Sequence, residues 1–260
     1  MELAGFITSF FIGITLGLIG GGGSVLTVPI LVYLFQVEPV LATSYSLFVV
    51  GTTSMVGTWQ KGIIGEINFR IALIFGLPSL LTVYLIRKFL IPLIPEVIYD
   101  NNGLTVHRGT LMLVLFSLLM ITAAIGMLRP QEMKQPALPQ SAALAGLGIA
   151  VGILSGLLGA GGGFIIIPAL IFYASLDIKT AVGTSLLIIT INSLIGFSGD
   201  LSHHPINWNI LLPITGLAIA GTFAGHWLSG KIPPEGIKKI FGGFILIIGL
   251  FILIKELLFF

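Results

Sequence analysis

The chain has 260 residues, of which 56% are hydrophobic and only 8% are charged, and its formal net charge is +2. Soluble domains carry roughly a quarter charged residues, so this composition excludes a soluble globular protein and indicates a polytopic helical membrane protein. The small net charge excludes a basic surface for nucleic acid, and the absence of cysteine excludes disulfides and thiolate metal sites.

The apolar segments predict an all-α fold with two groups of helices. The first group spans 3–19, 24–35, 40–59, 69–87 and 109–128, and the second spans 141–158, 163–175, 181–198, 208–228 and 237–258. Segment 24–35 would form about 18 Å of helix, which is short for a hydrocarbon core about 30 Å thick. We therefore expect it to turn back inside the membrane, where non-helical backbone must be buried in protein or face a water-filled cavity.

The tract 129–140 is polar and rich in proline, which is typical of a linker. It divides the chain into a first transmembrane repeat at 1–128, the linker at 129–140, and a second transmembrane repeat at 141–260. The start of the chain lacks the basic region of a signal peptide, so we expect the first helix to be retained.

The two groups are copies of one another at a constant offset of 139 residues, the distance from Gly22 to Gly161. Chance alignment of apolar sequence does not keep glycine, proline, serine and asparagine in one register. The matches include Gly13/Gly152, Pro29/Pro168, Ser46/Ser185, Ser54/Ser193 and Asn68/Asn207. The first half also has an insertion, Val97–Arg108, which we place outside the membrane.

The orientation of the two halves depends on how segments 3–19 and 24–35 are connected. If they form a hairpin, each half has an odd number of segments and the second half is inverted. All Lys and Arg then fall on one side except Arg87, Lys88, Arg108 and Lys255. If they form one interrupted crossing, the positive charges are divided more evenly. The positive-inside rule prefers the first arrangement, so we predict inverted repeats with both termini on the outer side.

Glycine runs precede the short segment of each half, at Gly20–Gly23 and at Gly159–Gly163. Each glycine costs about 1 kcal/mol in a helix interior relative to alanine, so these runs predict breaks in glycine-broken helical hairpins. A helix that begins at Ser24 or Gly163 directs its free N–H groups and its positive dipole end toward the break, where small anions bind. Such discontinuous helices form the substrate site of many secondary transporters. Close packing through small residues is the alternative, but it does not explain consecutive glycines.

The next segment of each half carries polar side chains at helical spacing. Ser46 and Thr53 share one face, as do Ser185 and Asn192. These side chains could donate to a bound oxyanion, or serine and threonine could bond back to a carbonyl of the preceding turn. The predicted substrate-binding residues are Gly20, Gly21, Gly22, Gly23, Ser24, Ser46, Thr53, Gly159, Gly161, Gly162, Gly163, Ser185 and Asn192.

No charged residue is expected in the middle of a span, so an anion would be held by dipoles and neutral donors. Asp200, His203 and His204 are expected in a solvated loop, because adjacent histidines rarely ligate one metal and no third ligand at zinc-like spacing accompanies them. No metal site and no cofactor are predicted. Tryptophan falls at segment ends, as interfacial aromatic residues do, at Trp59, Trp208 and Trp227.

The run Gly17–Ser24 with Pro29 and Tyr45–Gly51, and its counterpart Gly156–Gly163 with Pro168 and Ala181–Leu187, carry a resemblance. They resemble the two halves of the sulfite exporter TauE/SafE family of membrane permeases. This resemblance implies export or uptake of small sulfur-containing anions: sulfite, thiosulfate, sulfoacetate or other organosulfonates. It also implies that the glycine breaks and the two matched serines form the site. The four consecutive glycines and the insertion depart from the family pattern, and neither selects a substrate.

The leading hypothesis is a secondary transporter of such anions that works by alternating access in the cell (inner) membrane. An anion channel of the same fold is the first alternative. A membrane-embedded enzyme is a weaker one, because the usual hydrolase and ATPase motifs are missing. The expected partners are a small anionic substrate, the lipid bilayer and a coupling ion, either a proton or sodium, with no nucleic acid. The oligomeric state is not predicted.

Overall fold

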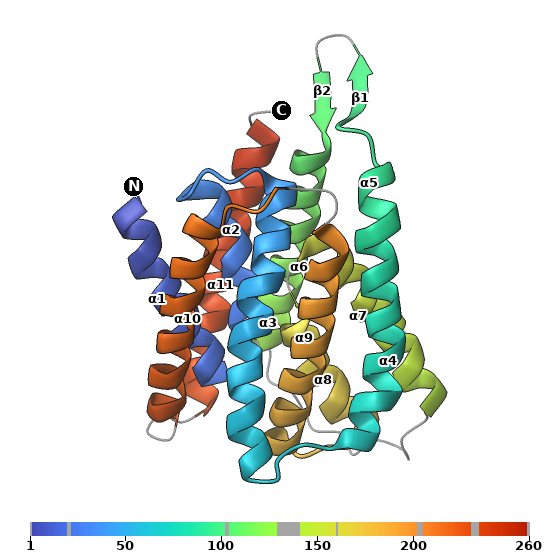
Figure 1. Cartoon of the computed structure of the whole chain (residues 1–260), viewed down its shortest axis with the longest axis vertical. Helices are drawn as coiled ribbons and strands as arrows, with labels where there is room; N and C mark the ends of the chain where they lie inside the picture. Colours follow the sequence, from blue (N-terminus) through green and yellow to red (C-terminus); the bar gives the residue numbers. More distant parts are fainter. Residues whose placement is uncertain are drawn as a thin grey trace.

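The computed structural model describes residues 2–19, 22–101, 104–128, 141–159, 161–201, 205–229 and 234–258, so the predicted linker lies outside the described residues. The elements in chain order are α1 (Glu2–Ile19), the 3-10 turn η1 (Gly22–Leu26), α2 (Thr27–Tyr33), α3 (Pro39–Ile63), α4 (Phe69–Leu85), the π-helical turn η2 (Ile86–Leu90), α5 (Ile91–Leu93), β1 (Val97–Asn101), β2 (Leu104–His107), α6 (Arg108–Leu128), α7 (Ser141–Leu158), α8 (Gly163–Ala174), α9 (Ile178–Asp200), α10 (Trp208–Ser229) and α11 (Pro234–Leu258). The predicted all-α polytopic fold is confirmed, and each predicted segment coincides with helical structure (Figure 1).

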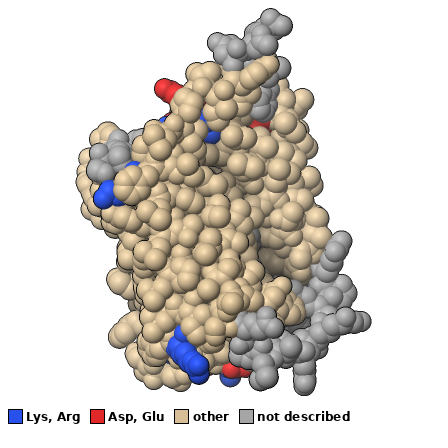
Figure 2. Space-filling view, turned by 90° about the vertical axis from the view of Figure 1, so that its right-hand side faces the viewer, with Lys and Arg blue, Asp and Glu red and all other residues tan. Residues whose placement is uncertain are grey.

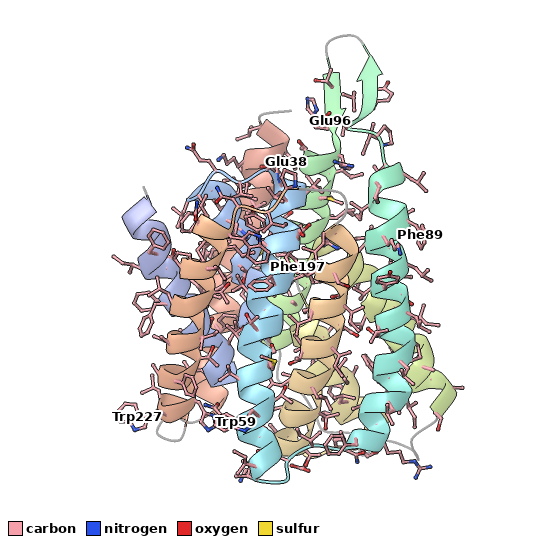
Figure 3. The ribbon with its side chains drawn as sticks, in the orientation of Figure 1. Glu38, Trp59, Phe89, Glu96, Phe197 and Trp227 are labelled. Carbon is pink, nitrogen blue, oxygen red and sulfur yellow. The ribbon has the colours of Figure 1, made fainter. Side chains whose placement is uncertain are left out.

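In the described part of the chain, 7 helices are long and apolar enough to cross a membrane: α3, α4 together with η2 and α5, α6, α7, α9, α10 and α11. The visible face in Figure 2 carries its charged side chains near the two ends, with an uncharged band between them. Trp59 and Trp227 point outward at one end of the bundle (Figure 3) and are 64% and 66% exposed, as expected of interfacial tryptophans. The molecule is a multi-pass membrane protein.

Helices α3 and α9 form the centre of the bundle and pack against each other. In the most apolar stretch of each helix, 72% of α3 and 67% of α9 is buried inside the protein, against 28–39% for the other spanning helices. Local sequence sets where they begin. Pro39 occupies the first turn of α3, where its missing N–H costs nothing. The Asp177 side chain caps α9 by accepting hydrogen bonds from the backbone of Lys179 and Thr180, each at 3.1 Å.

The main contacts between helices have a counterpart between the equivalent helices of the other half. Helix α1 packs on α10 while α7 packs on α4, and α2 packs on α3 while α8 packs on α9. The same exchange holds for individual residues. A Cβ atom on Gly13 would meet the carbonyl of Ala218, and one on Gly152 would meet the carbonyl of Ser79, each pair being related by the 139-residue offset.

Two hydrogen bonds between the halves follow the same offset. The backbone N–H of Asn68 donates to Thr184 Oγ1 at 2.9 Å, and the backbone N–H of Asn207 donates to the Tyr45 hydroxyl at 2.6 Å. In Figure 1, α3 and α9 run in opposite directions, and the two ends of the chain lie toward the same end of the bundle. These observations support our interpretation of the duplication as an inverted repeat.

The insertion in the first half forms a β-hairpin, which the sequence analysis did not predict. Strands β1 and β2 are antiparallel, with Asp100 opposite Thr105. The hairpin projects beyond the helices at the end where the termini lie (Figure 1). Arg108 secures its base, because Nη1 donates to the carbonyls of Ile91 at 3.2 Å and Ile94 at 3.0 Å.

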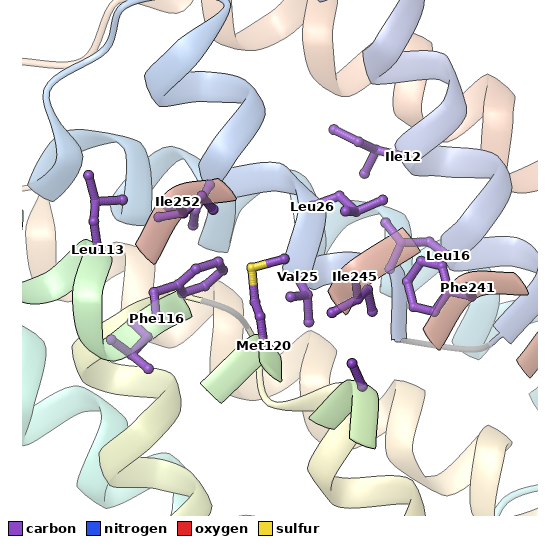
Figure 4. Close-up of a cluster of buried hydrophobic side chains, with 13 residues drawn as sticks. Ile12, Leu16, Val25, Leu26, Leu113, Phe116, Met120, Phe241, Ile245 and Ile252 are labelled. Carbon is purple, nitrogen blue, oxygen red and sulfur yellow. The ribbon is translucent and has the colours of Figure 1, made fainter. Parts of the chain in front are cut away.

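A buried hydrophobic cluster joins the first glycine-containing segment to the outer helices (Figure 4). Val25 and Leu26 of η1 lie in this cluster with residues of α1, α6, α7 and α11. Phe116 and Met120 of α6 are almost completely buried there. The 3-10 turn is therefore held inside the protein.

Substitution of Gly221 by valine should destabilise the protein, because its Cβ atom would collide with the carbonyl of Phe10 where α10 crosses α1. Overpacking of this kind costs about 1–3 kcal/mol. Gly216 on the same helix is the control, because nothing lies within 4 Å of its Cβ position. Thermal unfolding in detergent should show a lower midpoint for Gly221→Val than for Gly216→Val. Equal midpoints would contradict the close α1–α10 contact.

Candidate functional site

The second glycine break connects the end of α7 to the start of α8. Gly159, Gly161 and Gly162 have φ values of +67°, +64° and +72°. This left-handed conformation costs other residues roughly 1–2 kcal/mol, so the break requires glycine. Gly162 is the N-cap of α8 and provides no side-chain hydrogen bond to the helix. The positive end of α8 therefore faces the break, as predicted for a helix that begins at Gly163.

The second break is enclosed by protein. A Cβ atom on Gly161 would lie 2.8 Å from Val50 Cγ1 of α3 and 3.2 Å from Ser193 Oγ of α9. A Cβ atom on Gly159 would lie 2.6 Å from Thr43 Cβ of α3. Because the described glycines of the break are buried, its non-helical backbone is shielded from lipid, as a bilayer requires.

The first glycine break differs in detail from its counterpart. Gly20 and Gly21 lie outside the described residues, while Gly22 and Gly23 belong to the 3-10 turn η1. The predicted helix start at Ser24 is wrong: the α-helix begins at Thr27, and Ser24 lies inside the 3-10 turn. A glycine-rich segment can take up this tighter winding before the α-helix resumes.

The two breaks lie next to each other. Segment η1 contacts α8. Leu158, the last residue of α7, belongs to the same buried cluster as Val25 and Leu26 of η1. Ser24 is completely buried. The structure therefore brings the described parts of both predicted glycine sites together in the interior.

Several buried hydroxyl groups have no hydrogen-bond partner among the described residues, and two of them, Ser155 and Ser193, lie against the second break. Ser46, a predicted site residue, is another of these hydroxyl groups and is completely buried. The others are not among the predicted substrate-binding residues: Ser44, Ser54 and Ser193 lie on the predicted polar segments, and Thr27 and Ser155 lie outside them. The available signal was the repeat, because Ser54 and Ser193 match at the same offset as the glycines.

The remaining predicted polar residues are engaged within the protein. Thr53 Oγ1 donates to the carbonyl of Val49 at 2.7 Å, and Ser185 Oγ donates to that of Val182 at 2.8 Å. These hydroxyls follow the alternative interpretation of bonding back to the preceding turn.

Asn192 is only partly engaged. Its Nδ2 donates to Ser79 Oγ at 2.7 Å, while its Oδ1 has no partner among the described residues.

Asp200 is not in a solvated loop, so this expectation is wrong. It is the last residue of α9, is 3% exposed, and pairs with Arg87, whose Nη1 lies 3.0 Å from Asp200 Oδ2. Its partner Arg87 lies toward the end of the apolar stretch Phe69–Leu93, not in the middle of the span, but its burial there was not predicted. His203 and His204 lie outside the described residues. Within the described ranges, no cluster of three His, Asp or Glu side chains could hold a metal ion.

The family model described as "Sulfite exporter TauE/SafE" matches residues 5–252, nearly the whole chain. The chain belongs to the sulfite exporter TauE/SafE family. This family of membrane transporters agrees with the multi-pass helical fold and with the motifs that carried the resemblance. No solved structure matches the chain.

Relatives from distant organisms are named as transporters. The chain is 29% identical over 251 residues to a probable membrane transporter protein of Xylella fastidiosa, covering 93% of this chain and 91% of the relative. It is 28% identical to the probable membrane transporter protein YunE of Bacillus subtilis, covering 86% and 87% of the two chains. It is 26% identical to a probable membrane transporter protein of Methanocaldococcus jannaschii, covering 95% and 94%.

Alanine at Gly161 should destabilise this TauE/SafE protein, because the left-handed backbone and the nearby Val50 both disfavour a Cβ atom. The left-handed conformation alone costs about 1–2 kcal/mol. Gly126 in α6 is the control, since its Cβ position is open and alanine in a helix is favoured by about 1 kcal/mol. Thermal unfolding should show a lower midpoint for Gly161→Ala and an unchanged or higher one for Gly126→Ala. A Gly161→Ala midpoint at or above the wild-type value would contradict the geometry of the break.

Proposed function

We propose that this TauE/SafE protein is a secondary transporter of small sulfur-containing anions in the cell (inner) membrane. The candidate substrates are sulfite, thiosulfate, sulfoacetate and other organosulfonates, and the coupling ion is a proton or sodium. The proposal includes alternating access about the interface between the two halves, with both termini on the outer side.

The observation that carries the proposal is the meeting of two glycine breaks beside unpaired hydroxyl groups. The N-terminus of α8 supplies backbone N–H groups and a positive dipole end without a side-chain cap. Ser193 Oγ lies against Gly161 and has no partner among the described residues. A buried hydroxyl without a partner costs about 1–3 kcal/mol, and a bound oxyanion would satisfy it.

Not all the predicted residues contribute equally to this proposal. A hydroxyl that already donates to a carbonyl has no proton left for an anion. Thr53 and Ser185 are in that position, so they are weaker anion donors here than Ser46 and Ser193. The 12-residue helix α8 also presents a better aligned N-terminus than α2, which has 7 residues and follows a 3-10 turn.

The burial of the site favours a carrier over a channel. Ser24, Ser46, Ser185 and Asn192 are all completely buried, and Thr53 is 1% exposed. Burial of these side chains supports a carrier, because an anion would need movement of the halves to reach them from either side. An open pore would leave such side chains in contact with water.

Flux measurements in proteoliposomes test the function directly. We expect uptake of at least one of sulfite, thiosulfate and sulfoacetate in preference to sulfate, and a dependence of the rate on a proton or sodium gradient. Unlabelled anion on the far side should accelerate uptake of labelled anion, because a carrier exchanges its substrate. Flux without this counterflow would favour the channel, and no flux of any sulfur anion would overturn the proposal.

Replacement of Ser193 by alanine should raise the KM of the transported anion about 10- to 150-fold, because a hydrogen bond to a charged group contributes about 1.5–3 kcal/mol. The fold should be unaffected, since the hydroxyl has no partner to lose. Ser198→Ala is the matched control on α9: its side chain is exposed and donates to the carbonyl of Ile195 at 2.7 Å. Unchanged KM in Ser193→Ala would remove this residue from the site.

A further inference from the structure

Arg87 is a completely buried cation in the membrane-spanning part of the protein. It lies in the π-helical turn η2, and its side chain has 0% relative exposure. Such π-turns are rare and occur often at functional sites. Gly199 allows the close approach of α9, because a Cβ atom there would lie 3.2 Å from Arg87 Cβ.

The hydrogen bonds of Arg87 leave one edge of its guanidinium unused. Nη1 donates to Asp200 Oδ2 and to Thr43 Oγ1, each at 3.0 Å. Nε and Nη2 are buried and have no partner among the described residues. These two nitrogens form one edge of a planar fork that matches two oxygens of an oxyanion. Burying such donors without a partner is unfavourable.

Arg87 and the second glycine break both contact the same residue, Thr43. Thr43 accepts a hydrogen bond from Arg87, and it also packs directly against Gly159. Arg87 therefore lies between the break and the end of the bundle at which α3 begins and α9 ends. In Figure 1 that end also carries the β-hairpin.

The residues that correspond to Arg87 and Asp200 in the other half of the repeat have different chemistry. The 139-residue offset relates Arg87 to His226 and Asp200 to Lys61. Lys61 pairs with Glu66 at 2.8 Å, and both side chains are 20% exposed. The repeat counterpart of the Arg87–Asp200 pair is therefore His226 with Lys61, which is not an acid–base pair, so the buried ion pair belongs to one end of the duplication only.

We propose that Arg87 forms an additional oxyanion subsite, which binds one anion through Nε and Nη2 on its way between the glycine breaks and the hairpin end. This inference rests on the transport function proposed above. Asp200 holds the guanidinium in place when no anion is bound. Its negative charge weakens the binding of the anion, which permits release.

The test compares variants of the full-length protein in detergent and in proteoliposomes. Thermal midpoints are measured with sulfite, thiosulfate, sulfate and chloride at equal ionic strength, and KM is measured for the transported anion. The double variant Arg87→Gln/Asp200→Asn removes both charges, so neither partner is left as an unpaired buried ion. Lys88→Gln is the matched control, because Lys88 is an exposed neighbour whose Nζ contacts Tyr84 at 2.9 Å.

We expect the double variant to fold but to lose part of the stabilisation by oxyanions, with KM at least about 10-fold higher, since charge-assisted hydrogen bonds are the strong ones. Asp200→Asn alone should lower KM several-fold, because the competing charge is gone. Lys88→Gln should behave as the wild type.

Wild-type KM and oxyanion stabilisation in a folded double variant would overturn the subsite. If the double variant does not fold, wild-type midpoints that sulfite, thiosulfate and sulfate raise no more than chloride does would overturn it instead. Failure of the transport proposal is distinguishable, because wild-type protein would then carry no sulfur anion. In that case the subsite is still tested by the rise in thermal midpoint that oxyanions cause. An equal rise in the wild type and in Asp200→Asn would refute it.

Discussion

Backbone N–H and C=O groups freed by a helix break cannot face hydrocarbon, and the architecture follows from this constraint. The chain contains two glycine breaks, and the described parts of both lie inside the bundle behind the central helices α3 and α9. Ser24 and Gly161 are buried. The outer helices cover this interior, and their exposed apolar side chains face outward. Because the breaks must be buried in protein, their backbone N–H and C=O groups make the interior of the bundle polar.

The interior contains two kinds of hydroxyl group, which differ in whether they are hydrogen-bonded within the protein. Those that bond back to their own helix, such as Thr53, are satisfied within the protein. Those without partners, such as Ser46 and Ser193, remain available to donate. The buried Arg87–Asp200 pair adds charge to an interior that otherwise relies on dipoles. In the proposed site, an anion would be held through many weak contacts, which suits binding followed by release.

Much of the fold could be predicted because long apolar runs leave few alternatives in a membrane. The helical spans follow from run length, and the glycine breaks follow from the poor helix propensity of glycine. The β-hairpin was missed because an insertion gives no repeat partner to read. Asp200 was misassigned because it borders a polar loop. Its spacing of eight residues from Asn192 places both on one helical face, and that periodicity was the unused signal.

Other features could not be predicted, because they depend on packing. Whether a serine donates to its own helix or to a neighbour is decided by the space around it, as the contrast between Ser185 and Ser46 shows. The 3-10 winding at Ser24 also has no sequence signature that distinguishes it from the helical start at Gly163. The partners of Arg87 come from helices far away in the sequence.

The duplicated halves differ in shape although their sequences share one register. One half winds its short segment as a 3-10 turn and a short helix, and the other as a longer helix after three left-handed glycines. Under the alternating access proposed above, the two halves would exchange these shapes, so the glycine breaks are the place where such a movement would be seen first.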